Sequence, residues 1–261
     1  MNIMARMRLL TFNIAHARGP TPIHQSLRGV SALQNNLRRI ARLIERLRVD
    51  IVALQEVDEN SRWAGSFDHL AYLQLHTGLA HAVHGVTNRR AGRYHLNYGN
   101  ALLTRFPIHH HETVPFGRST VGEKGFLFAE IDTPHGRVPL VNIHLNHNSR
   151  PKRLQQAAHL IRHVGELGQH RAAHWCMPPL FCGDFNTPSH LPDATATLLG
   201  WLEQTNNYTL LPKTGHTFPS AWPARALDYV FLPQQCREPR AKIVRSLLSD
   251  HQPVLVEFAA G

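Results

Sequence analysis

Apolar positions recur along the chain with two different spacings. From residue 31 to residue 48 they lie three or four residues apart, which predicts a helix that buries one face. The positions that carry this pattern are Leu33, Leu37, Ile40, Ile44 and Leu47. Residues 152–167 repeat it and predict a second long helix. By contrast, the nearly unbroken apolar runs at 50–55 and 179–185 are typical of strands that are covered on both faces.

Weaker patterns complete the prediction. Short helices are expected at 70–75 and 194–199, and further strands at 7–13, 100–104, 126–132, 137–145, 227–232, 242–246 and 254–258. The order strand, helix, strand ending in an acid occurs in 8–56 and again in 137–184. This mixture fits an α/β (α+β) fold in which two sheets pack face to face with helices outside. The periodicity alone also permits a single doubly wound sheet.

Nothing in the sequence divides the chain into parts. Its 261 residues could form two domains by length alone. However, there is no Gly/Ser linker, charge block or fixed repeat, and Pro and Gly are scattered through many short loops. We therefore predict one domain that spans residues 1–261.

The charge balance points to anionic partners. The formal net charge is +10 with 20 histidines left uncounted, which favours nucleic acid, a phosphoinositide or an anionic membrane surface. The basic residues are dispersed rather than gathered in one run, and an arginine-rich composition is also what a GC-rich genome gives. Charge alone therefore leaves nucleic-acid binding open.

Cysteine usage and the first residues indicate the compartment. Cys176, Cys182 and Cys236 cannot all pair and show no Cys-x-x-Cys spacing, as expected for thiols in a reducing compartment. The opening segment 1–14 is short for a signal peptide and lacks a small-residue cleavage site. No stretch approaches the ~18 apolar residues that a membrane span needs. We expect a soluble, cytoplasmic monomer without a transmembrane segment.

Acids, amides and histidines collect where the predicted strands end. The clusters at strand ends are Thr-Phe-Asn at 11–13, Leu-Gln-Glu-Val at 54–57 and Gly-Asp-Phe-Asn at 183–186, and a Ser-Asp-His triplet follows them at 249–251. They contain no candidate Ser or Cys nucleophile. Such a set suits the binding of a hard divalent cation and the activation of water. The sequence therefore points to hydrolysis of a phosphate ester.

Taken in order, these clusters resemble the endonuclease/exonuclease/phosphatase superfamily. The resemblance includes Asn-Ile-His-Leu at 142–145 and Leu-Asp-Tyr-Val at 227–230, and it covers nearly the whole chain. The segments 98–107 and 216–219 are similar to those of its small bacterial members. The resemblance implies a four-layer α/β/β/α sandwich with two mixed sheets and a deoxyribonuclease-like, metal-dependent phosphoesterase activity. Mg²⁺ is the expected cofactor, and Mn²⁺ is expected to substitute for it.

Three residues are candidates for holding the metal. Glu56 is a carboxylate that emerges from a buried strand, where it is costly unless it is paired or coordinated. Its alternative role is that of a salt-bridged acid at a strand end. The resemblance makes Asp250 a second carboxylate on the metal side. Asn13 is expected to join them by hydrogen bonding or through the metal shell.

The resemblance also assigns the catalytic residues. Asp184 would orient and deprotonate water, while Asn186 would hold the water or a phosphate oxygen. Asp228 would hydrogen-bond one ring nitrogen of His251 and favour its charged form, so that the other nitrogen can stabilise developing negative charge. His144 would contact the scissile phosphate.

Four further residues are candidates for the substrate end of the cleft. Arg93, Tyr98 and Asn100 lie just before or within one predicted strand. Lys124 stands where small bacterial relatives more often have an arginine, so that the charge is kept but the bidentate fork is lost.

The sequence thus predicts a metal-dependent phosphoesterase that hydrolyses a phosphodiester by in-line attack of an activated water. A DNA or RNA nuclease and a lipid phosphodiesterase of the same fold stay open, because fold and core chemistry do not determine the substrate. A non-catalytic nucleic-acid-binding module is the alternative from another class. Because the arginines are spread over helix faces, we predict weak, non-specific nucleic-acid binding and a small phosphodiester as the preferred substrate.

Overall fold

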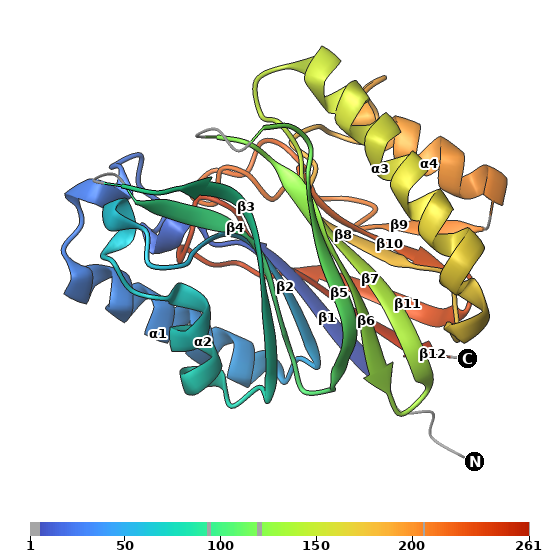
Figure 1. The fold of residues 1–261 in the computed structure, drawn as a ribbon, viewed down its shortest axis with the longest axis horizontal. Helices are drawn as coiled ribbons and strands as arrows, with labels where there is room; N and C mark the ends of the chain where they lie inside the picture. Colours follow the sequence, from blue (N-terminus) through green and yellow to red (C-terminus); the bar gives the residue numbers. More distant parts are fainter. Residues whose placement is uncertain (1–5, 93–94, 119–121, 206, 261) are drawn as a thin grey trace.

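Two sheets pack against each other and carry helices on their outer faces (Figure 1). The computed structural model describes residues 6–92, 95–118, 122–205 and 207–260. One sheet has six strands in the order β11-β12-β1-β2-β4-β3, and the other has six in the order β5-β6-β7-β8-β10-β9. This is the four-layer α/β/β/α sandwich that the sequence predicted, and the alternative of one doubly wound sheet is excluded.

The strands of the first sheet are β1 (Arg6–Asn13), β2 (Ile51–Asp58), β3 (His81–Arg90), β4 (Leu96–Thr104), β11 (Cys236–Ile243) and β12 (Val254–Ala260). Those of the second are β5 (Ile108–Pro115), β6 (Gly125–Thr133), β7 (Gly136–His144), β8 (Leu180–Asp184), β9 (Tyr208–Leu211) and β10 (Asp228–Pro233). The helices are α1 (Val30–Leu47), α2 (His69–Thr77), α3 (Arg150–Arg171) and α4 (Ala194–Thr205). Short 3₁₀ turns occur at Ala15–Ala17, Gln25–Leu27, Arg62–Ala64 and Ala172–His174.

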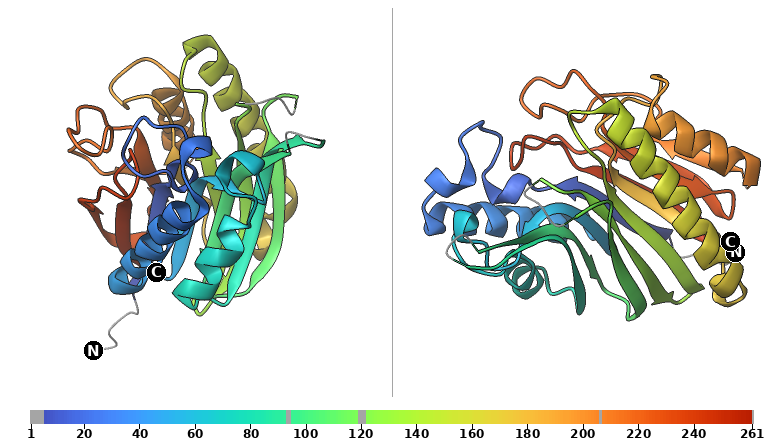
Figure 2. Two further views of the ribbon diagram at one scale, coloured as in Figure 1. Left: turned by 90° about the vertical axis from the view of Figure 1, so that its left-hand side faces the viewer. Right: turned by 45° about the horizontal axis from the view of Figure 1, so that its top comes forward.

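Alternating side chains divide the core into three apolar layers. On β1, Leu9 belongs to the layer between the two sheets, whereas Leu10 belongs to the layer beneath α1 and α2. On β8, Cys182 faces the central layer and Phe181 faces the layer beneath α3 and α4. The views in Figure 2 keep the two helix pairs on opposite outer sides of the sheets. Both sheets are thus covered on two faces, which explains their nearly continuous apolar runs.

Two parallel β-α-β crossovers bring the acidic strand ends together. β1 and β2 are parallel neighbours joined through α1, and β7 and β8 are parallel neighbours joined through α3. In register, Asn13 lies beside Gln55 and His144 lies beside Asp184. β10 runs antiparallel to β8, so its first residue, Asp228, also pairs with Asp184. The repeated strand-helix-strand pattern in the sequence thus corresponds to the two crossovers that place these residues at one end of the sandwich.

The sequence prediction failed at the sheet edges. The strand predicted at 242–246 is displaced, because β11 occupies Cys236–Ile243. β11 is an edge strand with mostly exposed side chains and a register shift between Arg237 and Arg240, so it lacks a clear apolar pattern. β3, β5 and β9 were not predicted, and each is also the outermost strand of its sheet.

Gly183 has a steric role in positioning the acid that follows it. Its φ is +140°, and a Cβ placed there would lie 1.9 Å from the carbonyl oxygen of Ile143 on β7. Any side chain would therefore force β8 away from β7. The glycine of the Gly-Asp-Phe-Asn cluster lets the two strands approach closely just before Asp184.

No helix within the described parts of the chain is both long and apolar enough to cross a membrane.

Candidate active site

Asp184, the last residue of β8, is the centre of the strand-end cluster. It is buried, and its Oδ2 accepts a hydrogen bond from Asn13 Nδ2 at 3.0 Å. The same oxygen lies 3.5 Å from His144 Nε2 and 3.6 Å from His251 Nε2. Four predicted site residues from four separate segments therefore meet at one carboxylate.

His251 is oriented by Asp228, as the sequence predicted. Its Nδ1 lies 2.9 Å from Asp228 Oδ2 and 3.2 Å from Oδ1, and its ring packs against that of Phe218 with the centroids 4.8 Å apart. The hydroxyl oxygen of Thr217 accepts a hydrogen bond from the Asp228 amide at 3.3 Å. These contacts hold the imidazole so that Nε2 faces Asp184.

Burial and charge shift the pKa values of Asp184 and His251 in the same direction. Burial raises the pKa of Asp184; His251 opposes this shift, Asp228 adds to it, and the net shift is upward. Burial lowers the pKa of His251, but Asp228 and Asp184 outweigh it and raise the pKa to about 10. His251 is therefore charged at neutral pH, while Asp184 can take up a proton more readily than an ordinary carboxylate.

Glu56 lies at an irregularity in β2. The register with β4 shifts between Leu54 and Val57, and Glu56 has a φ of 56°, in the left-handed region that favours glycine. A glutamate there has a strained backbone, at a cost of about 1–3 kcal/mol. The bulge inserts an extra residue at the strand end and so re-aims the Glu56 side chain.

The Glu56 carboxylate faces several basic groups. Lys124 Nζ lies 3.5 Å from Oε1, while His16 Nε2 lies 3.5 Å and Arg18 Nη1 3.7 Å from Oε2. His144 Nε2 is 3.9 Å from Oε1. Burial raises the pKa of Glu56, but Lys124 first and then His16, His144 and Arg18 outweigh it and hold the pKa well below its usual range.

Arg18 connects Glu56 to the second carboxylate predicted on the metal side. Its guanidinium forms an ion pair with Asp250 Oδ2 and lies near Glu56 on the other side. The same guanidinium thus lies next to both carboxylates. Both offer hard oxygen donors, which Mg²⁺ and Mn²⁺ prefer. The residues present at this position fit a divalent ion.

Asp184, Asp228 and His251 form a second group that could ligate a metal. One potential ligand atom from each lies within 4.8 Å of the others. However, Nδ1 of His251 is engaged with Asp228, and its Nε2 faces Asp184 at 3.6 Å, so both ring nitrogens already have an acid as partner. This group is better suited to proton transfer and charge stabilisation than to ligation.

The loop that follows β1 has an unusual backbone. Ala15, His16 and Ala17 all have left-handed φ values, of 49°, 51° and 62°. Each such residue costs about 1–2 kcal/mol when it is not glycine. The loop is held by Asn36 of α1, whose Nδ2 donates to Ala17 O at 3.0 Å and to Leu248 O at 2.8 Å. Asn36 thus ties the loop before Arg18 to the loop before Asp250.

His16, Arg18 and Asp58 belong to the site but were not predicted. His16 Nδ1 contacts Asp58 Oδ2 at 2.7 Å, and the indole of Trp63 donates to Asp58 Oδ1 at 2.7 Å. Two sequence signals could have found them. Asp58 follows Glu56 by two positions on one strand, and His16 and Arg18 lie in the first loop after a strand end that already carries Asn13.

The residues predicted for substrate binding differ in their surroundings. Lys124 contacts Glu56 and lies 3.4 Å from His144 Nδ1, so it belongs to the centre of the site. Tyr98 is buried, and its hydroxyl accepts a hydrogen bond from Gly122 N at 2.7 Å. Asn100 is also buried and donates to the carbonyls of Gly125 and Asn142, which is a structural contact between the sheets.

Asn186, predicted to hold the water or a phosphate oxygen, lies next to Asp184. The side chain of Asn186 donates to Leu145 O at 2.9 Å, and its backbone amide donates to Asp184 Oδ1 at 2.9 Å. Asn186 therefore helps to hold the Asp184 carboxylate in place. Arg93 lies outside the described residues.

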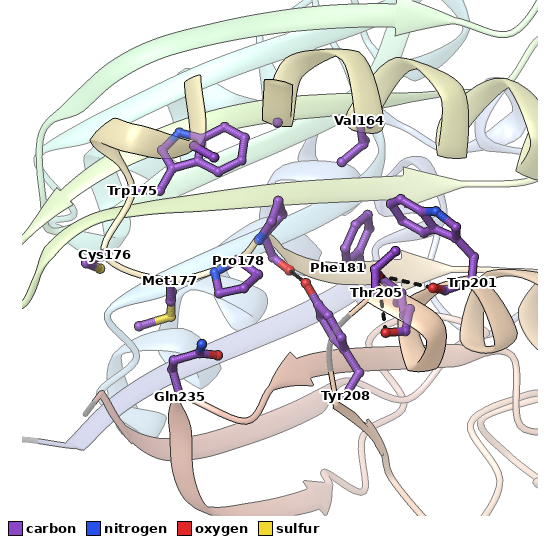
Figure 3. A pocket seen from close by; sticks show the side chains of 15 residues that line it. Val164, Trp175, Cys176, Met177, Pro178, Phe181, Trp201, Thr205, Tyr208 and Gln235 are labelled. Atoms are coloured by element: carbon purple, nitrogen blue, oxygen red, sulfur yellow. Dashed lines mark hydrogen bonds between the residues drawn. The ribbon is translucent and has the colours of Figure 1, made fainter. Parts of the chain in front are cut away.

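A separate hollow lies at the other ends of β8 and β10, away from this cluster. It has a volume of about 490 Å³, and its walls include Trp175, Met177, Phe181, Trp201 and Tyr208 (Figure 3). Its lining contains no carboxylate, histidine or basic side chain. The hollow therefore lacks the carboxylate and imidazole groups that hydrolysis of a phosphate ester needs, and the candidate active site is the strand-end cluster around Asp184.

Comparisons with known proteins agree with this geometry. Residues 10–251 match the model of the endonuclease/exonuclease/phosphatase family. No curated protein matches the chain.

Several solved structures share the fold. An endonuclease/exonuclease/phosphatase from Beutenbergia cavernae is 20% identical with a TM-score of 0.74, over 98% of this chain and 72% of that one. Truncated TDP2 from Caenorhabditis elegans is 17% identical with a TM-score of 0.67, over 98% of each chain. Sphingomyelinase C from Streptomyces griseocarneus is 19% identical with a TM-score of 0.68, over 97% of this chain and 99% of that one. At these identities the structures show a common fold.

Proposed function

Because this chain belongs to the endonuclease/exonuclease/phosphatase family, we propose that it is a Mg²⁺-dependent phosphodiesterase that cleaves a small phosphodiester with an activated water. The observation that carries the proposal is the Asp184 carboxylate, which lies in contact with Asn13, His144 and His251 at the end of both sheets. A buried acid with a raised pKa next to a charged imidazole can take a proton while negative charge develops beside it.

The roles of the residues follow from these positions. Asp184 orients the attacking water and accepts its proton as the new phosphorus–oxygen bond forms and the ester bond breaks. His251, charged and held by Asp228, stabilises the developing negative charge on the phosphoryl oxygens, and His144 binds the same group. The leaving oxygen takes its proton from solvent. Glu56 and Asp250 would hold the divalent ion, which when bound would offset the negative charge of the non-bridging phosphate oxygens.

A nuclease of the same fold is the second candidate. The formal net charge of +10 favours it, because a basic surface attracts polyanions. The exposed arginines of α1, such as Arg39 and Arg42, lie on an outer helix rather than at the strand ends, and this supports the smaller substrate.

A panel of phosphodiesters and phosphomonoesters tests the proposal. With Mg²⁺ or Mn²⁺ present, we expect turnover of small phosphodiesters, and the Asp184→Asn variant should be slower by about 10²- to 10⁴-fold because it cannot accept the water proton. Asp132→Asn, an equivalent change at a partly exposed acid on β6, should keep wild-type rates. Exclusive turnover of monoesters, or of long nucleic acid, would replace the proposed substrate class.

A further inference from the structure

A polar cleft adjoins the reacting centre. It has a volume of about 470 Å³ and lies between α3 and the loop segments 116–117 and 122–123, with Asn146, His147 and Asn148 also in its lining. In contrast to the hollow of Figure 3, its lining is mainly polar and basic. The roles proposed above for the residues that act on the scissile phosphate leave this cleft without a function.

One face of α3 supplies the basic side of the cleft. Lys152, Gln155, Gln156, His159 and Arg162 all line it. They recur at intervals of one or three residues, so they form a stripe along the helix. Lys152 and Arg162 are exposed and lie ten residues apart, which corresponds to about 15 Å along the helix axis.

The basic residues of α3 divide into engaged and available groups. Arg171 forms two hydrogen bonds of 2.7 Å with Glu130, and Arg153 forms an ion pair with Asp193. Within the described parts of the chain, by contrast, the side-chain nitrogens of Lys152 and Arg162 have no hydrogen bond or ion pair. The two available cations of this helix are the ones that face the cleft.

The inner end of the cleft meets the active site. Glu123 lines both this cleft and the small hollow that contains Glu56, Lys124 and His144. Its carboxylate accepts a hydrogen bond from Lys124 N at 3.1 Å and is the one acid among the cleft's described lining residues. An anionic group would therefore lie on the α3 side, next to the two cations.

We propose that this cleft binds a second phosphate group of the substrate, attracted by Lys152 and Arg162 at the two ends of the basic stripe. The inference rests on the proposed phosphodiesterase function and narrows its substrate to a small phosphodiester that carries a further phosphate. Gln155 and Asn148, which also line the cleft, supply hydrogen-bonding groups for the part of the substrate between the two phosphates. Lys152 and Arg162 act as specificity residues and take no part in the bond cleavage.

Matched pairs of substrates test the proposal. The first set compares dithymidine monophosphate with the same molecule carrying a 5′- or a 3′-phosphate, and the second compares glycerophosphoinositol with its ring-phosphorylated form. We expect kcat/KM to be about fivefold higher for at least one phosphate-bearing member, since exposed charge contacts are individually weak. The preference should shrink as salt is added. The set that shows it identifies the source of the phosphate.

Variants connect the preference to the cleft. In Lys152→Gln and Arg162→Gln, the ratio of kcat/KM for the phosphate-bearing substrate to kcat/KM for the plain substrate should fall toward one. Most of this change should come from a higher KM for the phosphate-bearing substrate. Arg42→Gln removes the same charge from an exposed position on α1 and should keep the wild-type ratio. A wild-type enzyme without any preference, or a preference that both cleft variants retain, overturns the proposal.

Binding separates failure of the cleft from failure of the catalytic proposal. If the wild-type protein hydrolyses none of these molecules, the proposed function fails, and calorimetric titration with the same pairs then decides on the cleft. Tighter binding of a phosphate-bearing member that is lost in Arg162→Gln supports the cleft. Equal affinity for the phosphate-bearing and the plain molecule would refute the proposed phosphate site in the cleft.

Discussion

Glu56→Gln should lower kcat/KM by at least about 10³-fold, a loss typical of removing a main electrostatic contribution to a transition state. The carboxylate is the common neighbour of Lys124, His16, His144 and Arg18, and with Asp250 it is the donor that fits a divalent ion. Burial and the nearby Lys124 hold the pKa of His144 well below its usual range, so this imidazole is neutral, and the charges to be balanced are those of the other three residues. An amide of the same shape cannot balance them. Calorimetric titration with Mg²⁺ should show weaker binding in parallel with the lost activity, and exhaustive chelation should abolish wild-type turnover.

The same change should destabilise the metal-free protein. The pKa of Glu56 is depressed in the fold, so its charged form contributes stability at neutral pH, and this contribution disappears only as pH falls through the depressed pKa. The melting temperature of Glu56→Gln should therefore be lower than that of wild type at pH 7, and the difference should narrow in acid. Glu45→Gln, an exposed change on α1, is the control. Undiminished activity with unchanged Mg²⁺ binding would refute the assignment of Glu56.

Asp228→Asn should slow the reaction by about 10²- to 10⁴-fold, within the range for residues of an acid–base pair. The amide keeps the hydrogen-bonding shape at 2.9 Å but removes the largest of the three negative charges, from Asp228, Asp184 and Asp250, that raise the pKa of His251 to about 10. Because the imidazolium is lost as pH rises through that pKa, the variant should lose activity at lower pH than wild type. A pH–rate profile measures this shift of the alkaline limb.

A double-mutant cycle shows whether the pair acts as a unit. Once Asp228 is replaced, His251→Gln should add little further loss, since the two residues support one function. Fully additive losses would mean that His251 acts without Asp228. An unshifted alkaline limb in Asp228→Asn would mean that another group sets it.

The interior of this fold could be predicted from the sequence more fully than its edges. α1 and α3 follow from apolar spacing, and β2 and β8 follow from apolar runs, because both faces of the inner strands are covered. The outermost strands β3, β5, β9 and β11 were missed or displaced. An edge strand is half exposed and needs no regular apolar alternation, so its sequence resembles that of a loop.

The site shows a similar division. Asp184 and Glu56 stand out because each ends a buried run, which makes a charged group conspicuous, whereas His251 was assigned through the family resemblance. The roles of Arg18 and Lys124 depend on contacts across the fold: Arg18 meets Asp250, which lies 232 residues away in sequence. No local pattern encodes such a contact. The same holds for the bulge that re-aims Glu56, since it exists only in the pairing of β2 with β4.

The two hydrogen bonds of Asn36 bear on how sequence variants of this protein should be interpreted. Asn36 is half-buried on α1 and touches none of the acids at the strand ends, so a change there looks like a tolerated helix-surface variant. Yet its amide is shared by the loops that carry Arg18 and Asp250, and one of these loops has a left-handed backbone that needs outside support. We expect Asn36→Ala to weaken Mg²⁺ binding and kcat together, while Asn35→Ala, one position earlier, should be silent in both measurements. Residue 36 would then score as functional in a mutational scan, although it lies outside the site.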